Sequence, residues 1–356
     1  MPDIPVNENG ESPQRKRRVR YKGTHPRRFE EKYKELHREK YAQDVAKIIQ
    51  SGKTPAGSHR PICVQEVLKL LDPRPGQTGL DATLGYGGHA SELLQRILPG
   101  GRLWGIDADP IESARTEARF RASGFTEEEL VVRRINFAGV PKLLAEAGGG
   151  FDFILADLGV SSMQLDDPAR GFTFKTEGPL DLRLNPTRGQ PAAALIRSIP
   201  EKKLEKILWD NADEPHARAI ARGIAQHRDS ISTTTDLAGV VRKALPGVSS
   251  KNSEEDITRS IRRTFQALRI AVNDEFAALD QFLRNLPLCL KPHGRVAVLT
   301  FHSGEDDRVV RSFTEGLERG AYEKIGKDPI RAASQERYDN PRSKSAILRW
   351  AVRTTF

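Results

Sequence analysis

An acid, two hydroxyls and an amide follow an apolar run near the middle of the chain. The run 151–157 ends at Asp157, and Ser161, Ser162 and Gln164 come soon after it. Buried positions rarely hold an acid that has no partner. We therefore expect these side chains to form a binding or reaction site; the alternative is an ordinary polar loop.

A second set of functional residue types lies in the segment 79–89. A short apolar run there is followed by Gly85, Gly87, Gly88 and His89, and a helical pattern begins at once. Glycines let a backbone turn sharply and approach a ligand closely, because they carry no Cβ. The segment predicts a ligand-binding turn at the carboxyl end of a strand, although a plain turn of any α/β protein has the same pattern.

Asp107 ends the next apolar run, 102–107. It lies about 20 residues past the glycines, where an acid can accept hydrogen bonds from both hydroxyls of a ribose. This spacing suits a dinucleotide or S-adenosylmethionine, and the sequence lacks the G-x-x-x-x-G-K-S/T motif of ATP-binding P-loops. The glycines also lack the G-x-G-x-x-G spacing, which makes an NAD-dependent dehydrogenase a distant alternative.

Alternating strand and helix patterns must position these residues. Apolar runs predict strands at 78–84, 102–107, 130–135, 151–157 and 294–300, with a last strand at 345–352 beside the fifth. Between the fourth and fifth strands, 168–259 has helical spacing without clear strands, and a long helix is predicted over 261–286. The fold class is therefore α/β, a doubly wound and mostly parallel sheet with an inserted all-helical subdomain.

Local signals place two helix starts. Asp109 and Pro110 predict a helix with an aspartate N-cap and proline at its first position. Phe301, His302 and Ser303 follow the fifth strand on the edge that carries the site. His302 is a candidate substrate contact, although a structural histidine or a helix-capping Ser303 is the better-supported interpretation.

Composition limits the class of protein. The chain has 356 residues and a formal net charge of +9, which favours a polyanionic partner such as nucleic acid. Its two cysteines, Cys63 and Cys289, give neither a disulfide framework nor a metal cluster, and we expect no metal. No apolar run is long enough to span a membrane and no signal core is present, so we expect a cytoplasmic protein.

Two segments carry concentrated basic charge. Residues 1–57 carry a basic run among polar residues, and we expect a partly disordered extension that is either an RNA-binding arm or a solubilising tail. Arg170, Phe172, Arg183 and Arg188 interleave aromatic and basic side chains, a pattern that suits base stacking and phosphate contact. A core role for Phe172 is equally open.

A set of ordered motifs narrows these possibilities. They are Gly87-Gly88-His89, Asp157–Ser162 with Gln164-Leu165-Asp166, Arg170-Gly171-Phe172, Gly178–Asp181, Asn185–Gln190, Arg263–Ile270, Phe301-His302-Ser303 and Asn340–Ser343. Together they resemble the bacterial 16S ribosomal RNA (cytosine(1402)-N(4))-methyltransferase family, from about His59 to Thr354 but not in the arm. The resemblance implies a class I (Rossmann-like) methyltransferase domain in 58–167 and 260–356, with 168–259 as an inserted substrate-recognition subdomain.

The same resemblance implies S-adenosylmethionine as methyl donor and a decoding-centre cytosine of 16S ribosomal RNA in the small subunit as acceptor. Gly85, Gly87, Gly88 and His89 would hold the donor at the first turn, with Asp107 on its ribose, Phe137 by the adenine, and Asp157 and Gln164 near the methionine end. Whether the enzyme is a homodimer stays open.

The expected chemistry is direct methyl transfer to an exocyclic amine. The protein then mainly positions two reactants, and acceptors must hold the amino hydrogens; we assign this role to Asp157 with Ser161 or Ser162. Methylation at C5 would need a cysteine nucleophile in the crevice, and neither cysteine lies there in the sequence pattern.

Two other functions compete with this one. A methyltransferase of the same fold acting on DNA, a small molecule or another RNA site is one alternative, although the Asp/Ser-Pro-Pro-aromatic motif of DNA N4-amino enzymes is absent after Asp157. A non-catalytic RNA-binding or assembly factor is the other. Gly304 stands where the family usually has leucine, an extra acid follows it, and the segment before Asn340 is short, which leaves the substrate contacts near the C-terminus open.

Overall fold

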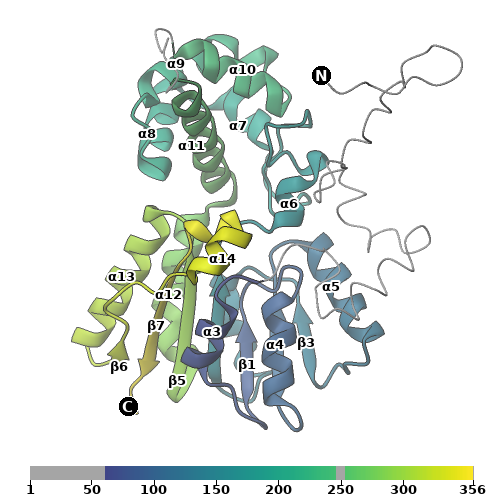
Figure 1. The fold of residues 1–356 in the computed structure, drawn as a ribbon. Coiled ribbons are helices and arrows are strands. Elements are labelled where there is room, and N and C mark those ends of the chain that lie inside the picture. Colours follow the sequence, from purple (N-terminus) through teal and green to yellow (C-terminus); the bar gives the residue numbers. More distant parts are fainter. Residues whose placement is uncertain (1–60, 246–252, 356) are drawn as a thin grey trace, which may run out of the picture. The chain divides into compact units, whose positions relative to one another are not determined.

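A mostly parallel sheet forms the centre of the protein, here described in a computed structural model for residues 61–245 and 253–355 (Figure 1). Its strands are β1 (Thr78–Asp81), β2 (Arg102–Ile106), β3 (Leu130–Arg133), β4 (Phe151–Asp157), β5 (Leu290–Thr300), β6 (Tyr322–Ile325) and β7 (Ile347–Arg353). Their order is β3-β2-β1-β4-β5-β7-β6. β7 runs antiparallel to both neighbours, whereas the five strands before it in this order are parallel. The carboxyl ends of β1, β2, β4 and β5 therefore meet at one edge.

Helices cover both faces of the sheet, and successive strand residues alternate between two cores. Ile154 of β4 belongs to the core shared with η2 (Phe137–Leu143), α12 (Glu275–Cys289) and α13 (Ser303–Glu318). Phe153 and Leu155 belong to the opposite core, with α3 (Val64–Leu71), α4 (Gly88–Ile97) and α5 (Pro110–Ala122). Burial on both faces explains why these strands are almost wholly apolar in sequence.

Several predicted elements are confirmed. The fourth strand covers 151–157 as predicted, and the last strand pairs with β5. The start of α5 also has the predicted form, because the Asp109 side chain accepts hydrogen bonds from the backbone N–H groups of Ile111 and Glu112, with Pro110 at the first helical position. β6 was not predicted; it is a short edge strand with only one buried residue, Tyr322.

A group of helices lies between β4 and β5 in the chain. It comprises α6 (Ser162–Asp166), η3 (Pro168–Arg170), α7 (Ala192–Ser198), α8 (Glu201–Ala212), α9 (Ala217–His227), η4 (Arg228–Ser230), α10 (Thr234–Ala244) and α11 (Ser253–Asn273). Leucine and isoleucine at helical spacing, such as Leu204, Leu208 and Ile220, pack into a core of their own. Within the described part of this segment, backbone pairing of the β type is limited to one isolated bridge, between Pro179 and Thr233.

The prediction of one long helix over 261–286 is wrong. The chain turns at Asp274, whose φ of 50° is left-handed, so that α11 and α12 are separate helices. The Asn273 side chain donates to the carbonyl of Leu182 and accepts from the N–H of Leu184, which anchors the corner to a distant loop. These contacts explain the break, because helical spacing alone continues through it.

The remaining described elements are α14 (Ser334–Asp339) and η5 (Pro341–Lys344), which precede β7. Over 61–245 and 253–355, none of the helices has the length and apolar content that crossing a lipid bilayer requires. The predicted basic extension, 1–57, lies outside the described residues.

Candidate functional site

The turn after β1 has a backbone that only glycine adopts easily. Gly85 and Gly87 have φ values of 46° and 74°. A Cβ on Gly87 would lie 2.5 Å from the ring of Phe120 in α5, so a side chain has no room there. The hydroxyl of Thr116, also in α5, donates to the Gly85 carbonyl at 2.6 Å. Helix α5 thus fixes the shape of the turn.

Asp107 lies directly beside this turn. One carboxylate oxygen accepts a hydrogen bond from the Gly85 N–H at 2.7 Å, and the other accepts from the Asp109 N–H at 2.8 Å. Burial raises the pKa of Asp107 to about 6, against the effect of these two hydrogen bonds. The structure therefore brings together the glycines and the acid that the sequence pairs for ribose binding.

Gly88 and His89 begin α4 and lie against Pro61 and Ile62, just before α3. A Cβ on Gly88 would lie 2.6 Å from the ring of Pro61. The His89 ring is buried, with Nε2 3.1 Å from the carbonyl of Ile62, and burial lowers the pKa of the imidazole to about 4. The ring is neutral at pH 7 and packs towards the start of α3, so a ligand contact by its side chain stays a prediction.

Two carboxylates lie at the adjoining ends of β1 and β4. The Asp157 N–H donates to the hydroxyl of Thr83 at 2.6 Å, and the Thr83 N–H donates to Asp81 at 3.1 Å. Asp157 Oδ1 is buried and has no hydrogen-bond partner among the described residues. Burial, followed by the charges of Asp81 and Glu305, raises the pKa of Asp157 to about 8.

Asp81 is itself almost fully buried, and burial raises its pKa to about 7 despite the hydrogen bond from Thr83. A buried acceptor without a donor costs free energy, and a nearby cation or donor removes that cost. The ends of β1 and β4 therefore suit a ligand that carries positive charge or N–H groups.

A small pocket of about 50 Å³ opens at the same strand ends. Its lining residues come from the carboxyl-end loops and from the start of α12: Thr83, Asn136, Phe137, Leu158, Gly159, Leu184, Asn273, Glu275, Phe276, Leu279 and Glu305. Phe137 is in this wall, as its expected place beside a ligand requires, and packs against Phe282 with ring centroids 5.2 Å apart. Its contact with an adenine stays a prediction.

The hydroxyl of Ser161 and the amide of Gln164 make structural contacts in the loop after β4. Ser161 is the N-cap of α6 and accepts from the Gln164 N–H, while the Gln164 side chain accepts from the Ser161 N–H in a capping box. The Gln164 amide also donates to Asp109 at 2.7 Å. Ser162 is the first residue of α6. Reaction roles for these three residues stay predictions.

The arginines and the aromatic ring predicted for RNA contact differ in exposure. Arg170 is buried and pairs with Asp109 at 2.7 Å, and Phe172 packs in the helical core, which favours the core interpretation left open for that ring. Arg183 is half-buried and forms an ion pair with Asp181, whereas Arg188 is exposed. Of this set, Arg188 best meets the exposure that a phosphate contact needs.

His302 and Ser303 begin α13, and the expected capping role of Ser303 is wrong. The N-cap position is His302, without a side-chain cap, and the Ser303 hydroxyl instead contacts Asp213 at 3.2 Å. His302 Nε2 lies 3.1 Å from Glu305, and its ring packs against Phe276. A structural histidine is the interpretation that these contacts favour.

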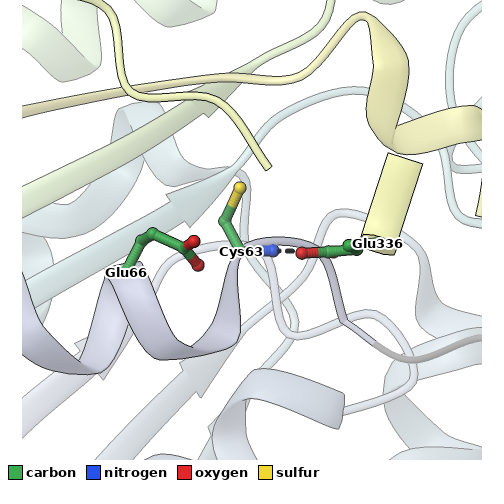
Figure 2. A group of neighbouring side chains, drawn as sticks. All are labelled: Cys63, Glu66 and Glu336. Carbon is green, nitrogen blue, oxygen red and sulfur yellow. Dashed lines mark hydrogen bonds between the residues drawn. The ribbon is translucent and has the colours of Figure 1, made fainter. Parts of the chain in front are cut away.

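One group among the described residues has ligand types that metals accept, at the start of α3 (Figure 2). The Cys63 N–H donates to Glu336 at 3.0 Å, and Glu66 lies nearby. Burial, reinforced by these two carboxylates, raises the pKa of the Cys63 thiol to about 12. The thiol is therefore protonated at pH 7, and we interpret the group as a structural contact between α3 and α14.

Sequence reasoning missed several residues at the site. Asp81 lies inside the strand predicted over 78–84, and only the observed end of β1 at Asp81 places it at the strand end as Asp157 is. Glu305 and Phe276 reach the pocket from α13 and α12, and no local pattern marks them. The place of Phe276 depends on the corner at Asp274, which the sequence analysis did not predict.

Fold and site together define a class of protein. A parallel sheet that ends in an antiparallel β7, a glycine turn after β1, an acid after β2 and a second acid after β4 make up the class I fold of S-adenosylmethionine-dependent methyltransferases. The chain belongs to the MraW methylase family, whose model matches residues 56–354.

Curated relatives agree with this membership. The chain is 51% identical to "Ribosomal RNA small subunit methyltransferase H 2" of Alkaliphilus metalliredigens, over 95% of the chain and 98% of that protein. It is 49% identical to "Ribosomal RNA small subunit methyltransferase H 1" of Lachnoclostridium phytofermentans, over 96% and 94%. The protein "Ribosomal RNA small subunit methyltransferase H" of Halorhodospira halophila is 41% identical, over 84% and 95%.

These coverages differ at the N-terminal end. The family model begins at residue 56, so coverage of 95–96% must include residues before it. The motifs that resemble the family begin at about His59. The similarity to these two relatives starts earlier in the chain, within the basic extension.

S-adenosylmethionine is the methyl donor of this chain, and the site fits it. The donor carries a positive sulfonium and an amino group, which suit Asp81 and Asp157, two buried acids whose raised pKa values a nearby cation would lower. Its ribose suits Asp107, which the Gly85 turn holds in place.

Proposed function

We propose that this protein methylates the exocyclic N4 amine of a cytosine in 16S ribosomal RNA, position 1402 by family resemblance. The observation that carries the proposal is the buried Asp157 oxygen without a donor, beside a pocket at the ends of β1 and β4. Support for the substrate comes from relatives named as ribosomal RNA small subunit methyltransferases over nearly their whole length.

Asp157 would hold the acceptor amine. Bound S-adenosylmethionine supplies an electrophilic methyl group. The unpartnered carboxylate oxygen of Asp157 accepts an amino hydrogen and so aims the nitrogen lone pair, with Ser161 or Ser162 as a second acceptor. Positioning of this kind can supply most of the rate enhancement of a two-reactant step. A cationic donor nearby would lower the raised pKa of Asp157, and the ionised carboxylate could then take up the proton that the amine loses.

The cysteines support N4 over C5 as the methylated atom. C5 methylation requires a thiolate nucleophile at the reacting base. Cys63 and Cys289 are both buried, and burial raises their pKa values to about 12 and about 11. Neither of them lines the pocket.

The predicted cofactor residues, substrate residues, domains and partner are part of this proposal. Gly85, Gly87, Gly88, His89, Asp107, Phe137 and Gln164 would form the donor side. On the substrate side, Arg188 and Arg183 are the proposed contacts, whereas the packing of Arg170, Phe172 and His302 favours structural roles. The chain would divide into a methyltransferase domain, 58–167 and 260–356, and a substrate-recognition insert, 168–259. Its partner would be the small ribosomal subunit in the cytoplasm, and the basic extension 1–57 would contribute phosphate contacts.

Mass spectrometry of small-subunit ribosomal RNA tests the proposal. A strain that lacks this protein should lose one N4-methylated cytosine, which the wild-type chain restores and the Asp157→Ala variant does not. An unchanged methylation map would overturn the RNA assignment and favour DNA or a small molecule. Failure of the purified chain to bind S-adenosylmethionine in calorimetry would favour a non-catalytic factor.

A further inference from the structure

Phe276 lies at the first turn of α12, where it lines the pocket together with Glu305 and Asn273. Gly304 lies directly against it. A Cβ on Gly304 would be 2.6 Å from Phe276 Cζ and 3.4 Å from His302 Nδ1. The glycine that replaces the usual leucine thus makes room for this ring.

Arg308 holds the ring from another side. Its guanidinium carbon lies 3.7 Å from the centre of the Phe276 ring, a distance that places the charge over one ring face. The same guanidinium donates to the Gly304 carbonyl at 2.9 Å and approaches Asp280 at 3.3 Å. Arg308 therefore covers one face, Gly304 and the His302 ring also contact Phe276, and the ring stays half-buried and borders the pocket.

The sheet order places the residues that contact Phe276 away from Asp107, the acid proposed for the ribose. Asp107 follows β2, whereas Gly304 and Glu305 follow β5, on the other side of β1 and β4. Asp157, at the end of β4, lies between them. Phe276, which touches the β5 side, thus lies across Asp157 from Asp107, in a pocket that Phe137 also lines.

We propose that Phe276 is the stacking surface for the target base, and that Gly304 and Arg308 hold its ring in place for that purpose. This inference rests on the proposed function, because it takes an unstacked pyrimidine as the occupant. A target base must leave its stack to reach such a pocket, and an aromatic ring replaces the lost stacking. Aromatic stacking accepts any base, so selection of cytosine falls to Asp157 and its neighbours.

The test compares variants of the full chain. Phe276→Leu should lower kcat/KM for small-subunit RNA by about 10- to 100-fold and leave S-adenosylmethionine binding unchanged in calorimetry. Gly304→Ala pushes the ring aside and should fall between Phe276→Leu and wild type. Phe276→Tyr keeps the ring but adds a hydroxyl at Cζ, the atom against Gly304, and should likewise be intermediate. Phe125→Leu is the matched control, since Phe125 packs with the opposite core.

A cytidine titration, followed by the NMR signals of the Phe276 ring, separates this inference from the function on which it rests. Wild-type efficiency of Phe276→Leu on RNA would overturn the inference alone. An equal loss of S-adenosylmethionine affinity would also overturn it, because the ring would then belong to the donor side. If the wild-type chain leaves the RNA unmethylated, the proposed function fails. The inference then depends on the titration alone: shifts of the Phe276 ring signals on adding cytidine would support it, and unchanged signals would overturn it. Thermal unfolding confirms that each variant is folded.

Discussion

Two groups of buried acids lie near the same edge of the sheet and differ in their partners. Asp109, at the start of α5, accepts hydrogen bonds from the N–H groups of Ile111 and Glu112 and from the side chains of Gln164 and Arg170. At the ends of β1 and β4, Asp81 has the Thr83 N–H and Asp157 has a buried oxygen without a donor among the described residues.

The difference separates structure from chemistry. A buried carboxylate with several donors joins elements of the fold. The Asp109 N–H donates to Asp107, and its carboxylate accepts from Arg170. Arg170 also donates to the carbonyls of Arg183 and Leu184. A buried carboxylate without donors only costs free energy in the free protein, so its presence indicates a ligand. Removing the Asp157 carboxylate should therefore lower activity without lowering stability. Removing Arg170, the partner of Asp109, should lower stability.

The largest effect on activity is expected at Asp157. Asp157→Ala should lower kcat for RNA methylation at least about 100-fold, because the amine loses its acceptor. The free energy of unfolding should stay equal or rise, since an unpartnered buried carboxylate is removed. Steady-state kinetics and urea unfolding measure the two quantities. Asp157→Asn keeps one acceptor oxygen and should be intermediate; a large loss of stability in either variant would place Asp157 with Asp109 as a structural acid.

Arg170→Ala should give the reverse result. It leaves Asp109 buried with less compensation, and breaking such a pair lowers the free energy of unfolding by about 3–5 kcal/mol. Urea unfolding measures this loss. Arg242→Ala is the matched control, because Arg242 and its partner Glu254 are 49% and 65% exposed and should contribute about 0–1 kcal/mol. If Arg170→Ala has only a mild effect on stability but loses RNA binding, the result would favour the sequence prediction that Arg170 contacts phosphate.

The pH dependence of stability sharpens the comparison further. Folding raises the pKa values of Asp157 and Asp81 from 3.8 to about 8 and about 7. The protonated forms therefore favour the folded state, and their stabilising effect is complete below pH 4 and lost as pH rises towards 8. Between pH 5 and pH 8, the Tm of the donor-free wild type should fall by several degrees relative to Asp81→Asn/Asp157→Asn. Parallel Tm curves for the two proteins would contradict the raised pKa values.

Asp81→Asn alone should act on Asp157. Burial is the larger cause of the raised Asp157 pKa and the charge of Asp81 is the next, so removing that charge should lower the Asp157 pKa. An NMR titration of the Asp157 carboxyl carbon in the donor-free protein measures this shift. Glu305→Gln should give a smaller shift in the same direction, because Glu305 is the weaker of the two neighbours. An unchanged Asp157 pKa in Asp81→Asn would mean that the two acids are not coupled.

Local signals predicted much of this arrangement, and long-range contacts account for what they missed. The acid at the end of β4, the glycine turn and the Asp109-Pro110 helix start depend on neighbours in sequence, so they could be inferred. The corner at Asp274 depends on contacts of Asn273 with the loop at Leu182 and Leu184, about 90 residues away, and helical spacing does not reveal it.

The same limit explains the residues around the pocket. Arg170 has the residue type of a phosphate contact, but burial against Asp109 decides its role, and burial is not visible in a motif. Phe276 reaches the pocket only because α12 begins at that corner. The departure at Gly304, which is plain in the sequence, acquires its physical reason once Phe276 is placed against it.

A half-buried carboxylate, Glu336, lies between these two cases and gives the smallest expected effect. It accepts the N–H of Cys63, a residue with a left-handed φ of 57°, while burial and the nearby Glu66 raise its pKa (Figure 2). Glu336→Gln keeps the acceptor oxygen and removes the repulsion, so stability should stay equal or rise by about 0.5 kcal/mol. Glu336→Ala leaves the N–H without its partner and should cost about 1–2 kcal/mol.

Urea unfolding of the two variants decides which property of Glu336 matters. A loss in Glu336→Ala alone means that the hydrogen bond joins α14 to α3, as the Asp109 contacts join their elements. An equal loss in both variants means that the negative charge itself is required, which would favour a cation held with Glu66 and the thiol of Cys63. Because burial keeps that thiol protonated at pH 7, we expect the first result.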